Sequence, residues 1–360
     1  VAHFGLEHHQ SSDNRSRERA LIESAQRNLM SGLLPHEFVH SWNGKFRRPL
    51  GLATDGFDKP MRGDLLWIYE GLTSYWGWVL SMRAGLCPAD WWRDDLAFTA
   101  AFMDTRAGRA WRPLEDTAVA AQAFNRAAHD WQSWRRSTDY YPEGVLLWLE
   151  ADVLIRQRSG GAKSLDDFAR AFYGGPNHGP EVKPYTLDDV IATLDGIVAN
   201  DWRAFFRAHL DQVQPRAPLG GIVGGGWQLG YDAKPNEHMH ALGTVDKVEN
   251  WSFSLGFEMK EDGVVGDVIP GSPAAKAGLG PAMRVVGVDG RKLGHESVTD
   301  ALKLDRGKIE LLVMNSDFYK IITIAYRGSD KNPHLVRDAA KKDLLEAIGR
   351  PLQTSISPTR

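Results

Sequence analysis

Cysteine is almost absent from this chain, because Cys87 is the single one among 360 residues. One cysteine excludes an intrachain disulfide framework, and it leaves the cellular compartment undetermined. Long apolar runs are missing as well: no stretch approaches the roughly 18 to 20 residues that cross a bilayer as a helix. The formal net charge is only -3, so no excess of basic residues predicts nucleic acid or an anionic membrane as a partner.

What is present is the composition of a folded globular protein, with 42% hydrophobic and 25% charged residues. The length exceeds that of one average domain, so we expect two or three folding units. The first residues, VAHFGLEHHQ, have neither the basic start nor the apolar stretch of a signal peptide. They do not resemble a natural beginning either, so we expect a longer protein whose N-terminal part, with any targeting information, lies upstream.

Residues 1–214 carry mostly helical signals. Apolar residues at helical spacing, with glycine and proline at the breaks, predict helices at 15–43 (interrupted at Ser31 and Gly32), 65–84, 88–105, 142–158, 164–173, 186–195 and 199–210. The segment 215–247 is rich in glycine and proline and predicts a linker with a strand or two.

After residue 247 the pattern changes to short apolar runs separated by glycine. The runs SFSLGFEM, GVVGDVI, MRVVGVDG, IELLVM and YKIITIAY predict the strands of a small β-rich domain at 248–328. The remainder, 329–360, predicts a helical tail whose helix is capped by Asn332 and ends at Gly349. The fold class predicted for the whole chain is therefore α+β and multidomain.

One motif points to a metal. The sequence HEFVHSWNGK sets His36 and His40 four residues apart, with Glu37 directly after the first histidine. On a helix, positions i and i+4 lie about 40° apart and one turn along the axis, so both imidazoles can face one ion. This H-E-x-x-H pattern is typical of zinc peptidases, in which the histidines bind the metal and the glutamate takes a proton from its water. Chance also produces such a motif on an ordinary helix, so a third ligand has to decide.

Glu70 is the predicted third ligand. It lies in WIYEGLTSYW, within a predicted helix and among large apolar residues, where an unpaired carboxylate is unfavourable to bury. It follows His40 by 30 positions, which is enough for one loop and a returning helix. Two antiparallel helices would then present His36, His40 and Glu70 to one zinc ion per chain and leave a fourth position for water.

The segment HEFVHSWNGK followed by WIYEGLTSYW resembles the glycyl aminopeptidase family of gluzincin zinc metallopeptidases. The resemblance implies a thermolysin-like catalytic lobe over residues 1–214, mostly helical here, whose strand-bearing part lies largely upstream. The segment GLEH matches the family's short motif ahead of the zinc helix, and it implies that Glu7 binds the free α-amine of the substrate. A carboxylate is also a suitable acceptor for an ammonium group on chemical grounds alone.

A tyrosine completes the expected site. The segment YYPEG resembles the family's tyrosine-containing segment, which implies that Tyr141 stabilises the oxyanion formed during hydrolysis. A phenol can donate a hydrogen bond to such an oxyanion. Pro142 and Glu143 stand where relatives more often carry a small residue and a lysine, so Tyr140 remains open as the alternative donor.

The β-rich region resembles a PDZ domain in the runs SLGFEM, VIPGSPAAKAGL and VVGVDGRKL. The resemblance implies that Leu255, Gly256 and Phe257 form the loop whose backbone N–H groups capture the C-terminal carboxylate of a peptide, with residues 296–303 as the helix along the groove. Ala282 and Met283 depart from the usual Gly-Asp of that family. The alternative is a domain that packs against the catalytic region and binds no peptide.

Together these features predict a zinc-dependent aminopeptidase that hydrolyses N-terminal residues from peptides by a zinc-bound water. The family resemblance implies a preference for small residues such as glycine or alanine. Two alternatives stay open: an endopeptidase that uses the same zinc, and a catalytically inert scaffold whose PDZ domain binds peptides. His36, Glu37, His40 and Glu70 are all present, which argues against the inert scaffold.

Overall fold

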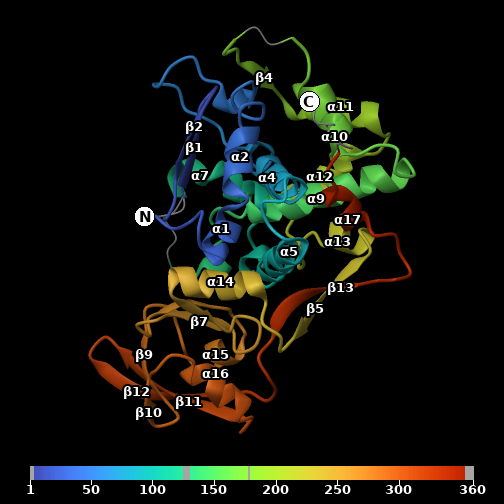
Figure 1. Cartoon of the computed structure of the whole chain (residues 1–360). Helices are drawn as coiled ribbons and strands as arrows, with labels where there is room; N and C mark the ends of the chain where they lie inside the picture. The colour runs from blue at the N-terminus through green and yellow to red at the C-terminus, as the bar shows by residue number, and fades with distance from the viewer. Residues whose placement is uncertain (1–3, 125–129, 177–178, 353–360) are drawn as a thin grey trace.

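A computed structural model of the chain describes residues 4–124, 130–176 and 179–352. The fold mixes helices and sheets, and its buried apolar side chains form two large clusters. One cluster lies in a helical lobe, and the other lies in a β-rich module of residues 248–326. Figure 1 shows the lobe above the module, with α14 (Glu237–Asp246) at their junction. None of the described helices is both long and apolar enough to cross a membrane.

In its described part, the helical lobe contains four short strands and most of the helices. The strands are β1 (Phe4–Glu7), β2 (Ser12–Arg15), β3 (Arg47–Pro49) and β4 (Lys183–Tyr185). The helices are α1 (Ser24–Met30), α2 (Leu33–Val39), α3 (Leu66–Tyr69), α4 (Gly71–Arg83), α5 (Ala89–Asp104), α6 (Leu114–Val119), α7 (Ala121–Phe124), α8 (Gln132–Arg135), α9 (Pro142–Arg158), α10 (Leu165–Tyr173), α11 (Leu187–Ile197) and α12 (Trp202–Leu210), with 3-10 turns η1 (Leu50–Leu52) and η2 (Ala107–Ala110). β1 pairs antiparallel with β2, and β3 pairs parallel with β4.

The β-rich module contains two small sheets. Its strands are β6 (Val248–Asn250), β7 (Phe257–Lys260), β8 (Val265–Val268), β9 (Arg284–Val288), β10 (Arg291–Lys292), β11 (Lys308–Asn315) and β12 (Phe318–Ala325), and its helices are α15 (Pro273–Lys276) and α16 (Ser297–Lys303). The sheet orders are β6-β7-β8 and β10-β9-β11-β12. In β11 the buried residues Ile309, Leu311 and Val313 alternate with more exposed ones, as expected for a strand with one face on a core.

The remaining elements flank the module in sequence. α13 (Gly220–Gly224), β5 (Trp227–Asp232) and α14 precede it, and β13 (Asn332–Arg337) and α17 (Leu344–Gly349) follow it. β5 and β13 pair antiparallel over their full lengths. Ile222, Ala241 and Leu345 belong to the core of the lobe, so both flanks return to it.

Two predictions about these flanks need correction. The helix predicted from Asn332 to Gly349 is wrong in its first half, because residues 332–337 form β13 and the helix begins only at Leu344 after the cap Asp343. The pairing with β5 supplies backbone hydrogen bonds that local sequence preference does not reveal. The segment 215–247, predicted as a linker with a strand or two, contains one strand and two helices. The domain boundaries themselves stay a proposal.

Most helices predicted in the lobe are confirmed. α5, α9, α10, α11 and α12 match the predicted ranges within a few residues, and the strands β7, β8, β9, β11 and β12 overlap the predicted runs. The helix predicted from residue 15 is wrong at its start, because β2 continues to Arg15 and α1 begins only at Ser24. Leu21 and Ile22 lie at helical spacing but are 68% and 69% exposed, so no core contact supports a helix there.

A close crossing of two helices positions the site. α4 and α9 meet at Gly71 and Gly144, where a methyl group built on Gly144 would lie 2.5 Å from the Cα atom of Gly71. The crossing therefore requires glycine on both helices. Glu70 precedes the first of these glycines and Tyr141 begins the helix that carries the second, so the crossing brings the starts of both helices together.

Candidate metal centre and catalytic site

The two histidines of the H-E-x-x-H motif lie on one face of a short helix. His36 belongs to α2, and His40 is the residue that ends it. Their Nε2 atoms are 3.0 Å apart. The Nδ1 atom of His40 lies 2.8 Å from the backbone carbonyl of Asn43, and the Nδ1 atom of His36 lies 3.4 Å from the hydroxyl of Ser74. Such outer contacts orient each ring so that Nε2 faces the shared point.

Glu70 completes this group from the other side. It occupies the junction between α3 and α4, which interrupts the helix predicted at 65–84. Its Oε2 atom lies 3.4 Å from Nε2 of His36 and 3.4 Å from Nε2 of His40. Burial alone would raise the pKa of Glu70, but the hydrogen bonds from both histidines lower it to about 2. The carboxylate is therefore charged, buried and aimed at the two imidazoles.

These three atoms fit a zinc ion. Ligand atoms around a tetrahedral zinc with bonds of ~2.0 to 2.1 Å lie roughly 3.3 Å from one another. The three measured separations are 3.0, 3.4 and 3.4 Å. Two imidazoles and one carboxylate also match the donor set of catalytic zinc sites, which keep a fourth position open. His36, His40 and Glu70 are thus suited in both geometry and chemistry to hold zinc.

Glu37 lies beside this group and is in close contact with strand β1. It is 6% exposed, and its Oε2 atom has no hydrogen-bond partner among the residues that the structure describes. A methyl group built on Gly5 would lie 1.9 Å from its Oε1 atom, so the backbone of β1 covers this carboxylate. Burial is the main cause that raises the pKa of Glu37 to about 7, against the positive charge of His40.

Glu7, at the end of β1, reaches the same group. Ligand-type atoms of Glu7, Glu37 and His40 all lie within 4.8 Å of one another. Tyr69 donates a hydrogen bond of 2.5 Å to Oε1 of Glu7, and Nζ of Lys45 lies 3.3 Å from the same oxygen. Burial alone would raise the pKa of Glu7, but the charge of His40 and the hydrogen bond from Tyr69 lower it. Glu7 therefore carries a charge that is already partly balanced.

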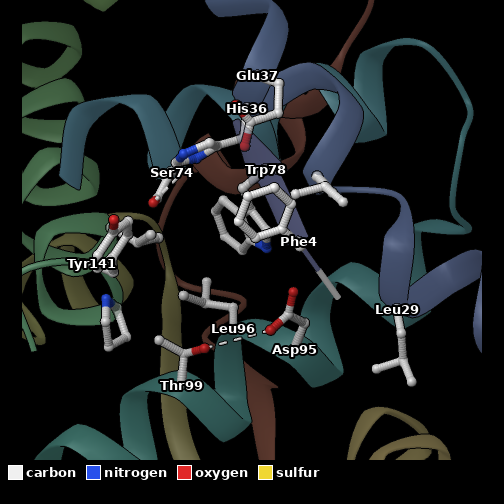
Figure 2. A pocket seen from close by; sticks show the side chains of 15 residues that line it. Phe4, Leu29, His36, Glu37, Ser74, Trp78, Asp95, Leu96, Thr99 and Tyr141 are labelled. Carbon is white, nitrogen blue, oxygen red and sulfur yellow. Dashed lines mark hydrogen bonds between the residues drawn. The ribbon is translucent and has the colours of Figure 1, made fainter. Parts of the chain in front are cut away.

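A cavity of about 420 Å³ opens next to the group of His36, His40 and Glu70, called the metal group below. Figure 2 shows His36 and Glu37 at one end and Asp95, hydrogen-bonded by Thr99, at the other. Tyr141 lines this cavity, and its ring centroid is 6.3 Å from that of His36. Burial, followed by the negative charge of Glu70, raises the pKa of Tyr141, so the phenol keeps its proton.

The alternative tyrosine has a different environment. Tyr140 is 2% exposed and belongs to the core of the lobe, and it is not among the residues that line the cavity. Its ring packs 4.8 Å from that of Tyr141. Of the two adjacent phenols, Tyr141 is the one with access to the cavity.

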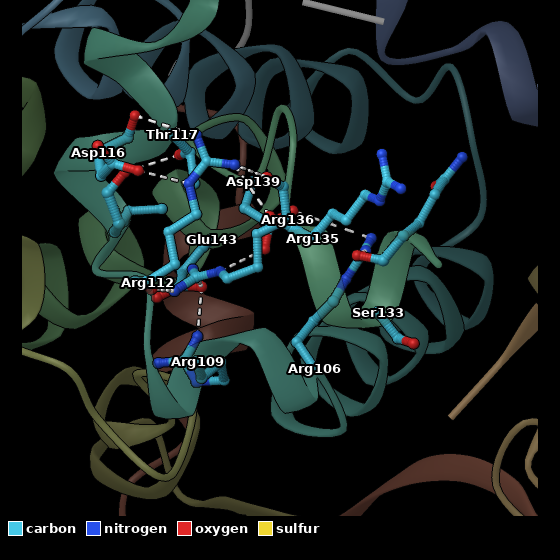
Figure 3. A network of polar contacts seen from close by, with 12 residues as sticks. Arg106, Arg109, Arg112, Asp116, Thr117, Ser133, Arg135, Arg136, Asp139 and Glu143 are labelled. Atoms are coloured by element: carbon cyan, nitrogen blue, oxygen red, sulfur yellow. Dashed lines mark hydrogen bonds and ion pairs between the residues drawn. The ribbon is translucent and has the colours of Figure 1, made fainter. Parts of the chain in front are cut away.

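A buried network of arginines and carboxylates holds the start of α9 (Figure 3). Arg136 donates to Asp139 at 2.8 Å and to Glu143 at 2.6 Å, and Arg109 also donates to Glu143. All four side chains are at most 4% exposed. Asp139 and Glu143 flank Tyr141 by two residues on each side, so the network fixes the backbone from which this phenol projects.

Several residues of this site escape sequence reasoning. Lys45, Tyr69 and Asn43 contact the expected residues, but nothing in the motif marks them before the fold is known. Asn43 anchors the loop after α2, because its side-chain amide donates to the carbonyl of Ile68 at 2.9 Å and to the hydroxyl of Thr73 at 2.9 Å. Glu143 could be noticed in the sequence, because relatives more often carry a lysine near this position. Its burial beside two arginines explains why a glutamate stands there.

The loop predicted to bind peptide lies elsewhere. Leu255, Gly256 and Phe257 belong to the β-rich module, which Figure 1 shows on the far side of the molecule from α2. The structure thus brings together His36, Glu37, His40, Glu70, Glu7 and Tyr141, and it keeps the module's loop apart from them.

Comparisons with known proteins find similarity to aminopeptidases. Residues 29–147 match the family model described as M61 glycyl aminopeptidase. Among solved structures, the chain is similar to an aminopeptidase N family protein from Idiomarina loihiensis, with a TM-score of 0.75 and 19% identity over 97% of this chain and 60% of that chain. This chain therefore spans about 60% of the length of that protein, and at this identity the likeness concerns the fold alone. No match was found among curated proteins. The part of the chain that is similar to M61 glycyl aminopeptidases contains both histidines, Glu37, Glu70 and Tyr141.

Proposed function

We propose that this chain carries the catalytic site of a zinc-dependent aminopeptidase. The observation behind the proposal is the convergence of Nε2 of His36, Nε2 of His40 and Oε2 of Glu70 at the spacing that zinc ligands require. The similarity of residues 29–147 to M61 glycyl aminopeptidases supports a peptidase reaction at the same residues.

The proposed division of roles follows from where each side chain lies. His36, His40 and Glu70 would hold one zinc ion per chain. When bound, zinc would polarise the scissile carbonyl and make a water molecule at the site more acidic. Glu37 lies next to His36 with one carboxylate oxygen free of protein partners among the described residues, so it is placed to accept the proton of that water.

Tyr141 is the proposed oxyanion donor. It projects into the cavity that His36 and Glu37 also line, and its phenol keeps its proton. A donor that is already oriented stabilises negative charge on the carbonyl oxygen without further reorganisation. The buried network of Arg109, Arg136, Asp139 and Glu143 would supply this orientation.

Glu7 is the proposed recognition group for the α-ammonium of the substrate. It lies beside Glu37 and His40, at the position where a free N-terminus would set which peptide bond reaches the metal group. The preference for a small first residue, glycine or alanine, rests on the similarity to glycyl aminopeptidases.

One observation favours an endopeptidase as the second candidate. Lys45 already places a positive charge 3.3 Å from Glu7, so this carboxylate has an internal partner before any substrate binds. If Lys45 keeps that position during turnover, Glu7 adds little to the binding of a free α-amine. The same group of His36, His40 and Glu70 would then cleave bonds within longer peptides.

Paired substrates separate these functions on the full-length protein. If the α-ammonium takes the place of Lys45 beside Glu7, an unblocked alanyl peptide and its N-acetylated form should differ in kcat/KM by hundreds-fold, because losing one partner of a buried charge pair costs about 2 to 5 kcal/mol. Glu7→Gln should narrow that difference, mainly by slowing the unblocked peptide. Equal cleavage of both peptides would refute the aminopeptidase and favour the endopeptidase. Zinc-loaded protein that cleaves neither of these peptides nor an internal bond of a longer peptide would leave the inert scaffold.

We further propose that the β-rich module is a PDZ domain. The loop before β7 supports this, because Gly256 has φ +88° and a methyl group built on it would lie 2.0 Å from Cβ of Ser272. Only glycine fits such a loop without strain. The position of α16 between β10 and β11 also agrees with the helix predicted at 296–303. Capture of a peptide by Leu255, Gly256 and Phe257 stays a prediction.

A further inference from the structure

The edge of β7 that a bound peptide would need is already paired. Strand β6 runs antiparallel to β7, with Val248 opposite Lys260 and Asn250 opposite Glu258, and β8 pairs with the other edge. A peptide that adds to a sheet requires a free edge of backbone N–H and C=O groups. Within the described residues β7 has none, because a segment of the same chain lies along it.

One N–H group of the predicted loop, that of Gly256, is engaged as well. The backbone N–H of Gly256 donates to the carbonyl oxygen of Trp251 at 2.8 Å, and the N–H of Ser254 donates to the same oxygen at 3.2 Å. In a PDZ domain, this loop directs its N–H groups at the terminal carboxylate of a peptide. Here the carbonyl of Trp251 accepts the bonds that a carboxylate oxygen would accept.

The indole of Trp251 fills the space between the loop and α16. The side chain is 2% exposed, and its ring centroid is 5.2 Å from that of Phe257. Its Nε1 donates to the hydroxyl of Thr299 on α16 at 3.1 Å. One side chain thus touches both walls of the groove, the strand side and the helix side.

Glu249 fixes the other end of the segment to α16. Nδ1 of His295, two residues before α16, lies 3.3 Å from the Oε1 atom of Glu249. Asn250, between Glu249 and Trp251, donates to the side chain of Glu258 on β7 at 3.1 Å. The segment 248–251 is therefore held by β7 on one side and by α16 on the other.

We propose that residues 248–251 are an intramolecular ligand that fills the peptide groove of the β-rich module. The strand pairing, the carbonyl that accepts from the N–H of Gly256 and the side chain against the helix are three contacts of the kind by which a peptide would be held. A tethered ligand acts at an effective concentration of about millimolar, so a free peptide competes poorly with it. The segment also follows α14 directly, and α14 packs on α1 and α5 of the lobe, so filling the groove ties the module to the lobe.

Hydrogen exchange on the full chain tests this proposal. The double variant Glu249→Ala/Trp251→Ala removes both anchors, and exchange in β7 should become about tenfold faster or more. Protection in β9 and β11, which form the other sheet, should fall less than in β7, since Trp251 belongs to the core that both sheets share. Adding the free peptide DKVENW, the sequence of residues 246–251 with a terminal carboxylate, should restore slow exchange in β7. Its C-terminal amide should restore less, because the loop binds a carboxylate more strongly.

A matched control removes the same kinds of side chain from exposed positions of the module. Glu261→Ala/Phe318→Ala should leave β7 protected. The milder variant Glu249→Ala leaves the apolar core intact and should give a smaller rise confined to β7. Three results would each overturn the proposal: unchanged exchange in β7 of both anchor variants, loss of protection in β9 and β11 together with β7 in Glu249→Ala, or no effect of the free peptide on the double variant.

Discussion

The carboxylate of Glu37 lies directly against the α-carbon of Gly5, so close that one added methyl group would be 1.9 Å from its Oε1 atom. Strand β1 and helix α2 therefore meet where the proposed proton acceptor lies. The position of Glu37 depends on Gly5, which takes no part in the chemistry. A substitution at Gly5 therefore moves the carboxylate of Glu37 without removing it.

Gly5→Ala should displace Glu37 and lower kcat by about 10² or more, since a misplaced proton acceptor loses most of its effect. Zinc content should stay at the wild-type value, because the proposed ligands His36, His40 and Glu70 are untouched. Gly196→Ala is the control: a methyl group there meets no atom within 4 Å, and the residue lies in α11. Wild-type kcat in Gly5→Ala would show that the side chain adjusts without consequence.

Zinc content gives a direct measure of the ligand set. Purified full-length protein should hold close to one zinc per chain, and His36→Ala or His40→Ala should lose it because two ligands bind far more weakly than three. Glu37→Gln should retain zinc but lose turnover, since an amide cannot accept a proton. His240→Ala, an exposed histidine, should change neither. Stoichiometric metal in both histidine variants, measured by mass spectrometry of the metal, would remove this group as the zinc site.

The two adjacent tyrosines should respond differently to loss of the hydroxyl group. Tyr141→Phe should lower kcat by roughly 10² to 10³ with little change in KM, the pattern expected when a donor acts only on the transition state. Tyr140→Phe should leave kcat within a few-fold, because this ring is in the core and outside the cavity. Steady-state kinetics on both variants decides, and the opposite ranking would move the role to Tyr140.

The buried ion pairs at the start of α9 should contribute to the stability of the fold. Glu143→Ala leaves Arg109 and Arg136 buried without their shared partner, so the free energy of unfolding should fall by about 3 to 5 kcal/mol. In Asp188→Ala, which breaks an exposed pair with Arg203, the fall should stay below about 1 kcal/mol. Urea unfolding of both variants measures the difference. If both variants lose less than about 1 kcal/mol, the network of Arg109, Arg136 and Glu143 does not stabilise the fold as proposed.

Stability should fall with rising pH through one carboxyl group of the module. Burial, with the charge of Asp267 next, raises the pKa of Glu258 from 4.5 to about 7. Between these two pKa values the folded state binds more protons than the unfolded state, so raising the pH across this window destabilises the fold by up to about 3 kcal/mol. Glu258→Gln should lack this loss, and its advantage over wild type should grow from pH 5 to pH 8 in urea unfolding. Glu261→Gln, at an exposed carboxylate, should show no such trend.

Sequence reasoning reached the parts of this molecule that depend on short-range pattern. The proposed roles of His36, Glu37 and His40 rest on helical spacing together with Glu70, a charge among apolar neighbours, and neither feature needs the fold. The roles of Glu7 and Tyr141 rest mainly on the resemblance to the family. Lys45 and Tyr69 could not be inferred, because their contacts with Glu7 depend on where β1 and the loop after α2 come to lie.

Strand β13 was missed for a related physical reason. Its pairing partner β5 lies about a hundred positions earlier, and the intervening module gives no local sign of the pairing. The same holds for residues 248–251, whose sequence does not indicate that they lie between β7 and α16. Local propensity predicts elements, whereas contacts between distant segments decide which elements meet.

Arg83, at the end of α4, donates to the carbonyl of Ile348, 265 positions later, and Gly349 packs on Met82 of the same helix. A ribosome that adds ~5 to 20 residues per second takes roughly 10 to 50 seconds to cover that separation. During this time the helix that begins at the metal group exists without α17 to cover its far end. The helices of the lobe are synthesised before the module, but the core of the lobe is completed only after it. A chaperone acting on this protein during translation would therefore find the end of α4 around Met82 uncovered.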